Sequence, residues 1–184
     1  MDLYRLPEEV VIGGKSYPLN TDFRVILKIF SVFADRSLPE VLRWRVALGL
    51  FYNSPVAPED QQEAMEYLSA FLTCGQPEKS GPELIHWQLD APAIIAGVNK
   101  AAGCEVRQME KVHWWTFLSW FHAMGPGQLS TVVSIRDKLR RGKKLEEWER
   151  TFYRETKDLV DRKTPPSRQQ LEEKQRLNRL LGDR

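Results

Sequence analysis

The sequence predicts a mainly α-helical fold: a compact bundle of about six helices with a small N-terminal β-hairpin and a protruding C-terminal helical extension. Apolar residues recur at helical spacing through most of residues 21–141. A Gly-Gly pair separates two short apolar runs near the N-terminus, which is typical of a hairpin. Beyond residue 142 the apolar residues form only a narrow seam among charges, as on a helix that stands away from a core.

Length and composition indicate one globular domain with extensions. The chain has 184 residues and is 42% hydrophobic, which is enough for a single core. We therefore expect an N-terminal segment, residues 1–20, packed on a helical core domain of residues 21–141. Residues 142–184 are expected to form a charged extension that is helical or partly disordered.

The hairpin is predicted over residues 9–19. Three apolar residues precede Gly13 and Gly14, and Tyr17 and Leu19 follow them. Glycine adopts positive φ angles at little cost, so this pair suits a tight two-residue turn. An isolated hairpin is marginal in water, and this one must therefore pack on the helices.

The turn region also contains the run Gly13-Gly14-Lys15-Ser16, which is similar to the end of a phosphate-binding loop. That motif requires a glycine five positions before Gly14, where Glu9 stands. It also requires a helix after Ser16, and Pro18 prevents one. We interpret the run as a turn.

The first helix is expected from Thr21 to Ala34, with Asn20 or Thr21 as its N-cap. Its apolar residues lie on two faces. Such a helix is either central in a core or docks a partner.

Two more helices follow. One begins after Pro39, because proline is tolerated in a first turn, and stops before Asn53. The next runs from about Pro58 to Thr73. Residues 75–83 are rich in glycine and proline and are expected to form a loop.

Three further helices complete the predicted core. The fourth follows Asp90, a suitable N-cap, and ends at Gly103. The fifth covers about residues 109–124. The sixth begins after the break at residues 125–127 and fades near Gly142.

The extension is expected to contain a helix over residues 143–160. Pro165 and Pro166 interrupt it, and Ser167 is a candidate cap for a final segment. The apolar residues of that segment are Leu171, Leu177, Leu180 and Leu181.

Charge is unevenly distributed along the chain. Residues 1–135 carry 11 Lys/Arg against 15 Asp/Glu, whereas residues 136–184 carry 16 against 10. A basic tail can mark a nucleic-acid-binding module, but acidic residues are interleaved throughout, as on a solvated helix with ion pairs. We favour the solvated helix and keep nucleic-acid binding as the alternative. The residues that would contact phosphates are Arg136, Lys138, Arg140, Arg141, Lys143 and Lys144.

No catalytic, cofactor or metal site is predicted, and we expect a protein that is not an enzyme. His113 and His122 are nine positions apart, which places them on opposite sides of a helix. His86 lies well before both of them in the sequence. Cys74 and Cys104 lack the paired spacing of a zinc site and are expected to be free thiols.

The sequence has no basic start followed by an apolar core, so no signal peptide is expected. No stretch approaches the roughly 18 apolar residues of a membrane span. We therefore expect a soluble, cytosolic protein.

Large aromatic side chains are concentrated between residues 87 and 121. They are suited to core packing or to a groove that takes an amphipathic helix, and spacing alone does not choose between the two. In the second interpretation Trp115 and Trp120 are the rings expected to be exposed. The candidate partner-binding residues are Trp114, Trp115, Phe117, Trp120 and Phe121.

The stretch from Ile85 to Arg141 resembles the bacteriophage gene-product-fifteen family of phages that infect Gram-positive bacteria. The matching features are Asp90 before a short apolar helix, the His-Trp-Trp-Thr-Phe run of residues 113–117, and the basic run of residues 135–139. The hairpin and the run of residues 20–24 are also similar to that family.

The resemblance implies a role rather than a reaction, because the family brings no catalytic residues. The position of its genes beside the tape measure gene implies a tail assembly chaperone of long-tailed phages, which would bind the tape measure protein in the host cytoplasm and be absent from the virion. The resemblance also implies an upstream tail chaperone as a second partner, either as a separate chain or as a frameshifted fusion with this one. The alternative in the same setting is a structural tail or connector component of the virion.

Overall fold

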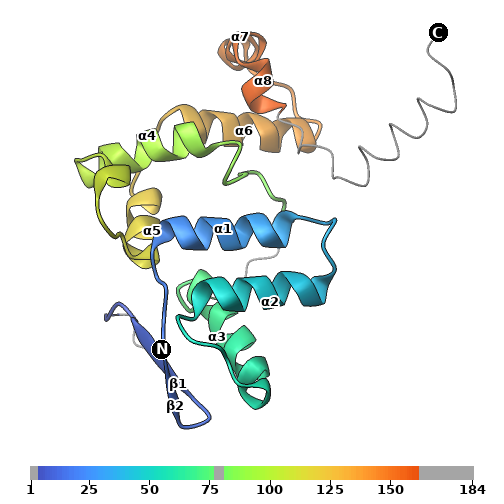
Figure 1. Cartoon of the computed structure of the whole chain (residues 1–184). Coiled ribbons are helices and arrows are strands. Elements are labelled where there is room, and N and C mark those ends of the chain that lie inside the picture. The colour runs from blue at the N-terminus through green and yellow to red at the C-terminus, as the bar shows by residue number, and fades with distance from the viewer. Residues whose placement is uncertain (1–3, 77–80, 162–184) are drawn as a thin grey trace, which may run out of the picture.

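The computed structural model describes residues 4–76 and 81–161 (Figure 1). The fold is mainly helical with a small N-terminal hairpin, as predicted. In these residues we find eight α-helices, compared with about six predicted for the bundle. The two additional helices lie in the segment that was predicted to form the extension.

The hairpin consists of β1, Glu9–Ile12, and β2, Lys15–Pro18, paired antiparallel with Ile12 opposite Lys15. Gly13 and Gly14 both have positive φ, at 56° and 77°, as the two-residue turn requires. Ile12 and Tyr17 are buried. The Tyr17 hydroxyl donates a hydrogen bond of 2.7 Å to Asp60, which holds the hairpin against the start of α3.

Three helices follow the hairpin: α1, Phe23–Ala34; α2, Glu40–Phe51; and α3, Gln61–Leu72, which a short 3-10 turn precedes. Figure 1 shows α1 and α2 running side by side, with α3 below α2. The α1 residues Phe23, Ile26 and Ile29 are buried, so this helix is central.

The N-cap of α1 is Asp22, not Asn20 or Thr21. Its carboxylate accepts the Arg24 backbone N–H at 2.9 Å. Thr21 is fully buried, and its carbonyl accepts the Trp114 N–H at 2.7 Å. The carbonyl of an N-cap residue accepts the first hydrogen bond of its helix, but the Thr21 carbonyl is already paired with Trp114. Thr21 therefore lies before the start of the helix.

The second half of the body contains α4, Ala91–Ala102; α5, Trp114–His122; and α6, Gln128–Arg140. The fifth helix was predicted to begin near residue 109 and begins five residues later. The preceding segment is extended because it pairs with the start of α1. Asp22 and His113 form an isolated antiparallel β-bridge, and the Phe23 N–H donates to the Val112 carbonyl at 2.9 Å.

Residues 143–161 do not form a single protruding helix. They form α7, Glu147–Glu155, and the short α8, Lys157–Val160, which turn back onto α6 (Figure 1). Val132 and Ile135 of α6 and Val160 of α8 form a second, small core beside the main one. The final helical segment predicted after Ser167 lies outside the described residues.

None of the helices in the described ranges has the length and apolarity needed to cross a membrane.

Candidate functional site

The His-Trp-Trp run is anchored by His113, which caps α5. Its Nδ1 accepts the Trp115 backbone N–H at 3.1 Å, and its Nε2 lies 3.2 Å from the Pro7 carbonyl. An acceptor at Nδ1 and a donor at Nε2 define the neutral imidazole. Burial lowers the pKa of His113, which favours the same neutral form.

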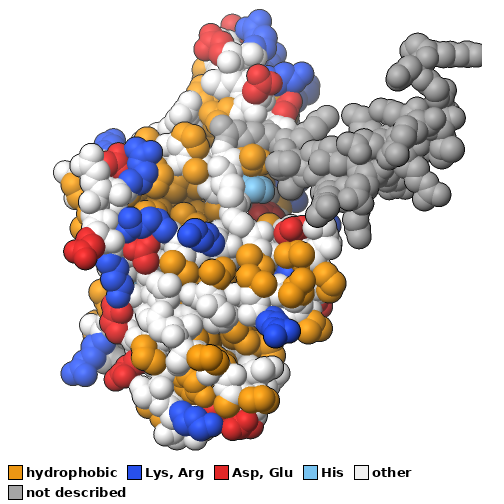
Figure 2. Space-filling view, viewed as in Figure 1, with side chains coloured by type: hydrophobic (Ala, Val, Ile, Leu, Met, Phe, Trp, Pro, Cys, Tyr) orange, Lys and Arg blue, Asp and Glu red, His pale blue; other side chains and the backbone are white. Residues whose placement is uncertain are grey.

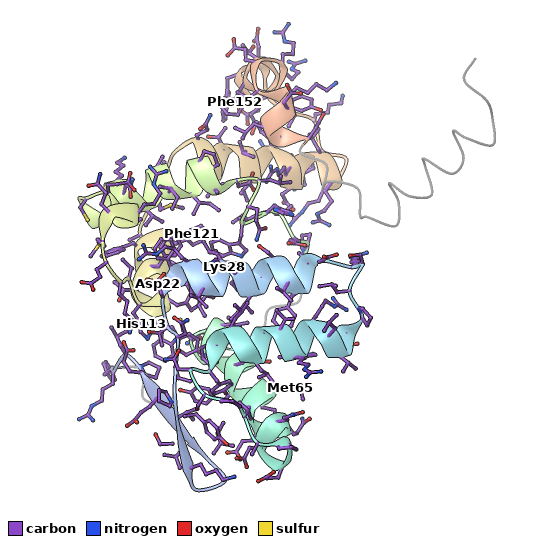
Figure 3. All side chains as sticks on the ribbon, in the orientation of Figure 1. Asp22, Lys28, Met65, His113, Phe121 and Phe152 are labelled. Atoms are coloured by element: carbon purple, nitrogen blue, oxygen red, sulfur yellow. The ribbon has the colours of Figure 1, made fainter. Side chains whose placement is uncertain are left out.

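Asp22 completes this junction between α1 and α5 (Figure 3). Its carboxylate accepts hydrogen bonds from the Arg24 guanidinium at 2.8 and 2.9 Å and from the Val112 N–H at 3.1 Å. Burial opposes ionisation of Asp22, but these hydrogen bonds outweigh it and lower the pKa. The start of α5 is therefore fixed by its own cap and by α1.

Of the two interpretations of these rings, the structure supports core packing for Trp115 and contradicts its exposure in a groove. The ring is only 6% exposed, and its indole N–H donates to the Phe71 carbonyl at 2.9 Å. Trp114 is 1% exposed and donates to the Leu72 carbonyl at 3.0 Å. Phe117 is fully buried and stacks on Phe23 at 4.4 Å between ring centroids. These three rings join α5 to α1 and α3 and are core residues.

Trp120 and Phe121, the other two predicted residues, are half-buried. Both pack against the main core, and the Phe121 ring lies 5.1 Å from that of Trp87. Phe121 also lines a groove that Trp120 does not line. Of the five predicted partner-binding residues, Phe121 alone is part of this groove.

The groove lies between α4 and the start of α6, with the end of α5 and the loop after it closing one side. Its volume is about 490 Å³. Its apolar lining includes Phe121 and Met124, and its rim includes exposed residues, which leave it open to solvent. The lining is Ile85, Ala93, Ala96, Gly97, Lys100, Phe121, His122, Met124, Gly125, Pro126, Gly127, Gln128, Leu129, Ser130 and Val133.

Two features of the groove were missed by sequence reasoning. A Cβ added at Gly97 would overlap the sulfur of Met124, so the absence of a side chain on α4 gives the methionine its place. Lys100 is the only Lys, Arg, Asp or Glu in the lining, and no carboxylate of the described residues pairs with it. A glycine inside a helical pattern is the one local signal that marked the first feature.

Farther along α6 than the groove, Arg136 links the helix to other parts of the protein. Its guanidinium holds both carboxylate oxygens of Asp90, at 2.7 and 3.0 Å. Its remaining N–H groups donate to the backbone carbonyls of Leu84, Leu159 and Val160. One side chain thus joins α4, α6, α8 and the segment before α4.

The basic residues proposed for phosphate contacts are largely committed to ion pairs within the chain. Arg136 pairs with the buried Asp90, and Lys138 pairs with the buried Glu149 at 2.6 Å. Arg140 and Arg141 both pair with Asp137 at 2.9 Å. A cation already paired contributes less to phosphate binding, so this geometry disfavours the nucleic-acid alternative.

The other sequence candidates do not converge on a chemical site. Gly13 and Gly14 form the hairpin turn, and the Ser16 hydroxyl donates to Glu9 at 2.9 Å. Cys74 is half-buried, and burial raises its pKa to about 11, which keeps the thiol protonated. Within the described residues no group of three or more His, Cys, Asp or Glu side chains is placed to hold a metal ion.

A second apolar surface lies on the outer side of α2. Val41 is 81% exposed, and Leu42 and Val46 are also exposed. Gly49 is on the same side of the helix, and a Cβ added there would meet nothing within 4 Å. Figure 2 shows hydrophobic side chains at the surface over α1 and α2. This surface could not be predicted from the sequence, because α2 has apolar residues on all of its sides.

Comparison with known proteins identifies a family. Residues 4–161 match the family model described as Bacteriophage Gp15 protein. No curated protein and no solved structure matches the chain. The family match extends beyond the region that carried the resemblance in the sequence and includes α7 and α8, so the fold-back onto α6 lies within the family's extent.

Proposed function

The chain belongs to the bacteriophage Gp15 family, and on that premise we propose that it is a non-catalytic tail assembly chaperone that binds the tape measure protein. Membership of the family points to a structural or morphogenesis protein of a phage. The more specific role follows from the resemblance in the sequence and from one structural observation. That observation is the solvent-open apolar groove between α4 and α6.

A groove of about 490 Å³ with apolar walls suits the side chains of an amphipathic segment. A tape measure protein is a long helical chain with apolar faces that must stay covered until the tail tube forms around it. A chaperone for such a chain needs contacts that are individually weak, repeated along the partner and readily released. An apolar groove that is open to solvent and partly lined by a methionine can provide contacts of that kind.

The proposal places the protein in the host cytoplasm during assembly and outside the finished virion. An upstream tail chaperone, as a separate chain or as a frameshifted fusion, is a second proposed partner. No cofactor is required for this role.

The test is co-expression of the full chain with the tape measure protein of the same phage, followed by affinity purification. We expect co-purification and a larger soluble fraction of the tape measure protein than in its absence. A matched culture that expresses an unrelated helical protein of similar size controls for a general effect of co-expression.

Mass spectrometry of purified virions separates the chaperone from a structural tail or connector component. A chaperone should be absent from the particles, whereas a structural component should be present in a fixed number of copies. Presence in the particles together with no binding to the tape measure protein would contradict the proposal.

A further inference from the structure

We infer that the groove between α4 and α6 binds an apolar side chain of an amphipathic helix that carries an aspartate or glutamate beside it. The inference rests on the proposed function for the identity of the partner, but its chemistry comes from the groove alone. It specifies which segments of a partner this site accepts and which it rejects.

The apolar part of the site comes from three parts of the chain. Ala93 and Gly97 of α4 form one wall, and Leu129 and Val133 of α6 form the other. Phe121 contributes from α5. The small residues of α4 leave room for the Met124 side chain at Gly97, and an incoming side chain can enter the part of the groove that stays open to solvent.

Met124, in the loop between α5 and α6, makes the groove lining adaptable. The side chain lies against the backbone of Gly97, and it is half-buried. Methionine has three rotatable bonds and a polarisable sulfur, so it can adjust to side chains of different shapes. Such a lining suits a partner that has many similar but non-identical apolar segments.

The charge at the rim selects the partner. Lys100 lies in the last turn of α4, lines the groove and has no ion-pair partner among the described residues. The groove lining contains no Asp or Glu, so nothing in it competes for the ammonium group. A partner helix with a carboxylate next to its apolar side chain gains an ion pair here, whereas one with a lysine there is repelled.

The direct test uses two synthetic amphipathic helical peptides and the full chain. Both peptides have the same leucine stripe; glutamates flank it in one, and lysines in the other. We expect the acidic peptide to bind more tightly, by about three- to tenfold, because one exposed ion pair replaces a repulsion. The difference should shrink as salt is added.

Two variants locate the binding. Ala96→Phe fills the groove from an exposed position on α4 and should weaken binding of the acidic peptide at least about tenfold. Lys100→Glu should reverse the preference between the peptides. The matched controls are Ala34→Phe and Lys28→Glu, which make the same changes at exposed positions of α1, a helix that contributes nothing to the groove lining. Figure 3 labels Lys28. Neither control should alter binding.

Three results would overturn the inference: no binding of either peptide, equal binding of both, or binding that Ala96→Phe leaves unchanged. Self-association of the chain that Ala96→Phe abolishes would also overturn it, because the occupant would then be a second copy. The tape measure experiment separates this inference from the proposed function. If the wild-type chain and both groove variants all co-purify with the tape measure protein, the function stands and the groove is not its site.

Discussion

Arg136 binds Asp90 through two parallel hydrogen bonds, of 2.7 and 3.0 Å, and neither residue is exposed. The three backbone carbonyls that it also contacts complete the five N–H donors of the guanidinium. A buried charge pair stabilises a fold only when its remaining donors and acceptors are satisfied in this way. The pair links the start of α4, which bears the groove, to α8.

We predict that Asp90→Ala lowers the free energy of unfolding by about 3–5 kcal/mol, because it leaves the Arg136 charge without its partner. Arg136→Lys keeps the charge but loses the two-pronged geometry and two of the five N–H donors, so it should also be strongly destabilising. Urea unfolding followed by circular dichroism measures both.

The control for that prediction is Arg140→Ala, which removes a surface ion pair with Asp137 and should change stability by less than about 1 kcal/mol. Equal effects of Asp90→Ala and Arg140→Ala would contradict the assigned role of the buried pair.

The helices were predictable from the sequence because their apolar periodicity is a local property. The start of α5 was not, since the extended residues before Trp114 pair with a segment about ninety positions earlier. The ion pairs of Arg136 and Lys138 could not be predicted for the same reason. Their carboxylate partners Asp90 and Glu149 are brought close only by the fold, so local patterning indicated solvated charges.

The candidate site was predictable only in part. A stripe of rings in α5 was visible, but which rings face the core depends on where α1 and α3 lie. The carbonyls of Phe71 and Leu72, at the end of α3, accept both indole N–H groups. That placement buries Trp114 and Trp115 and leaves Phe121 at the groove.

Trp115→Ala should therefore destabilise the fold by about 3–5 kcal/mol, as expected when a buried aromatic ring is removed. Thermal or urea unfolding measures the loss. Trp148→Ala is the matched control, because Trp148 is 56% exposed and its removal should change stability by less than about 0.5 kcal/mol. A Trp115→Ala protein as stable as the Trp148→Ala protein would place the Trp115 ring outside the core.

Gly49 and Gly103 should respond oppositely to the same substitution. Gly49 is inside α2 with open space around its Cα, so Gly49→Ala should stabilise the protein by about 0.5–1 kcal/mol. Gly103 ends α4 with a φ of 73°, a conformation that L side chains rarely adopt. Gly103→Ala should cost about 1–2 kcal/mol. Urea unfolding of both variants tests the pair, and the same sign for both would be inconsistent with the structure.

His113 makes the stability of the junction between α1 and α5 depend on pH. Burial lowers its pKa in the folded protein below the ordinary value of 6.5 and outweighs the Pro7 carbonyl and Glu8, which raise the pKa; Lys111 also lowers it. Between the folded and unfolded pKa values the unfolded chain binds more protons, so stability falls as the pH drops below about 6.5 and levels off below the folded pKa. Protonation would also place a hydrogen on Nδ1, the atom that accepts the Trp115 N–H.

The free energy of unfolding, measured from about pH 7.5 to pH 5, should therefore decrease more steeply for the wild type than for His113→Asn. Asparagine is a good N-cap residue and has no titratable group, so this substitution keeps a capping side chain and removes the protonation. Nearby Asp22 has a lowered pKa and is ionised over this range in both proteins, and its contribution cancels in the comparison. Parallel pH profiles for the two proteins would mean that the imidazole is as easily protonated in the folded chain as in the unfolded one, against its burial and its bond to Trp115.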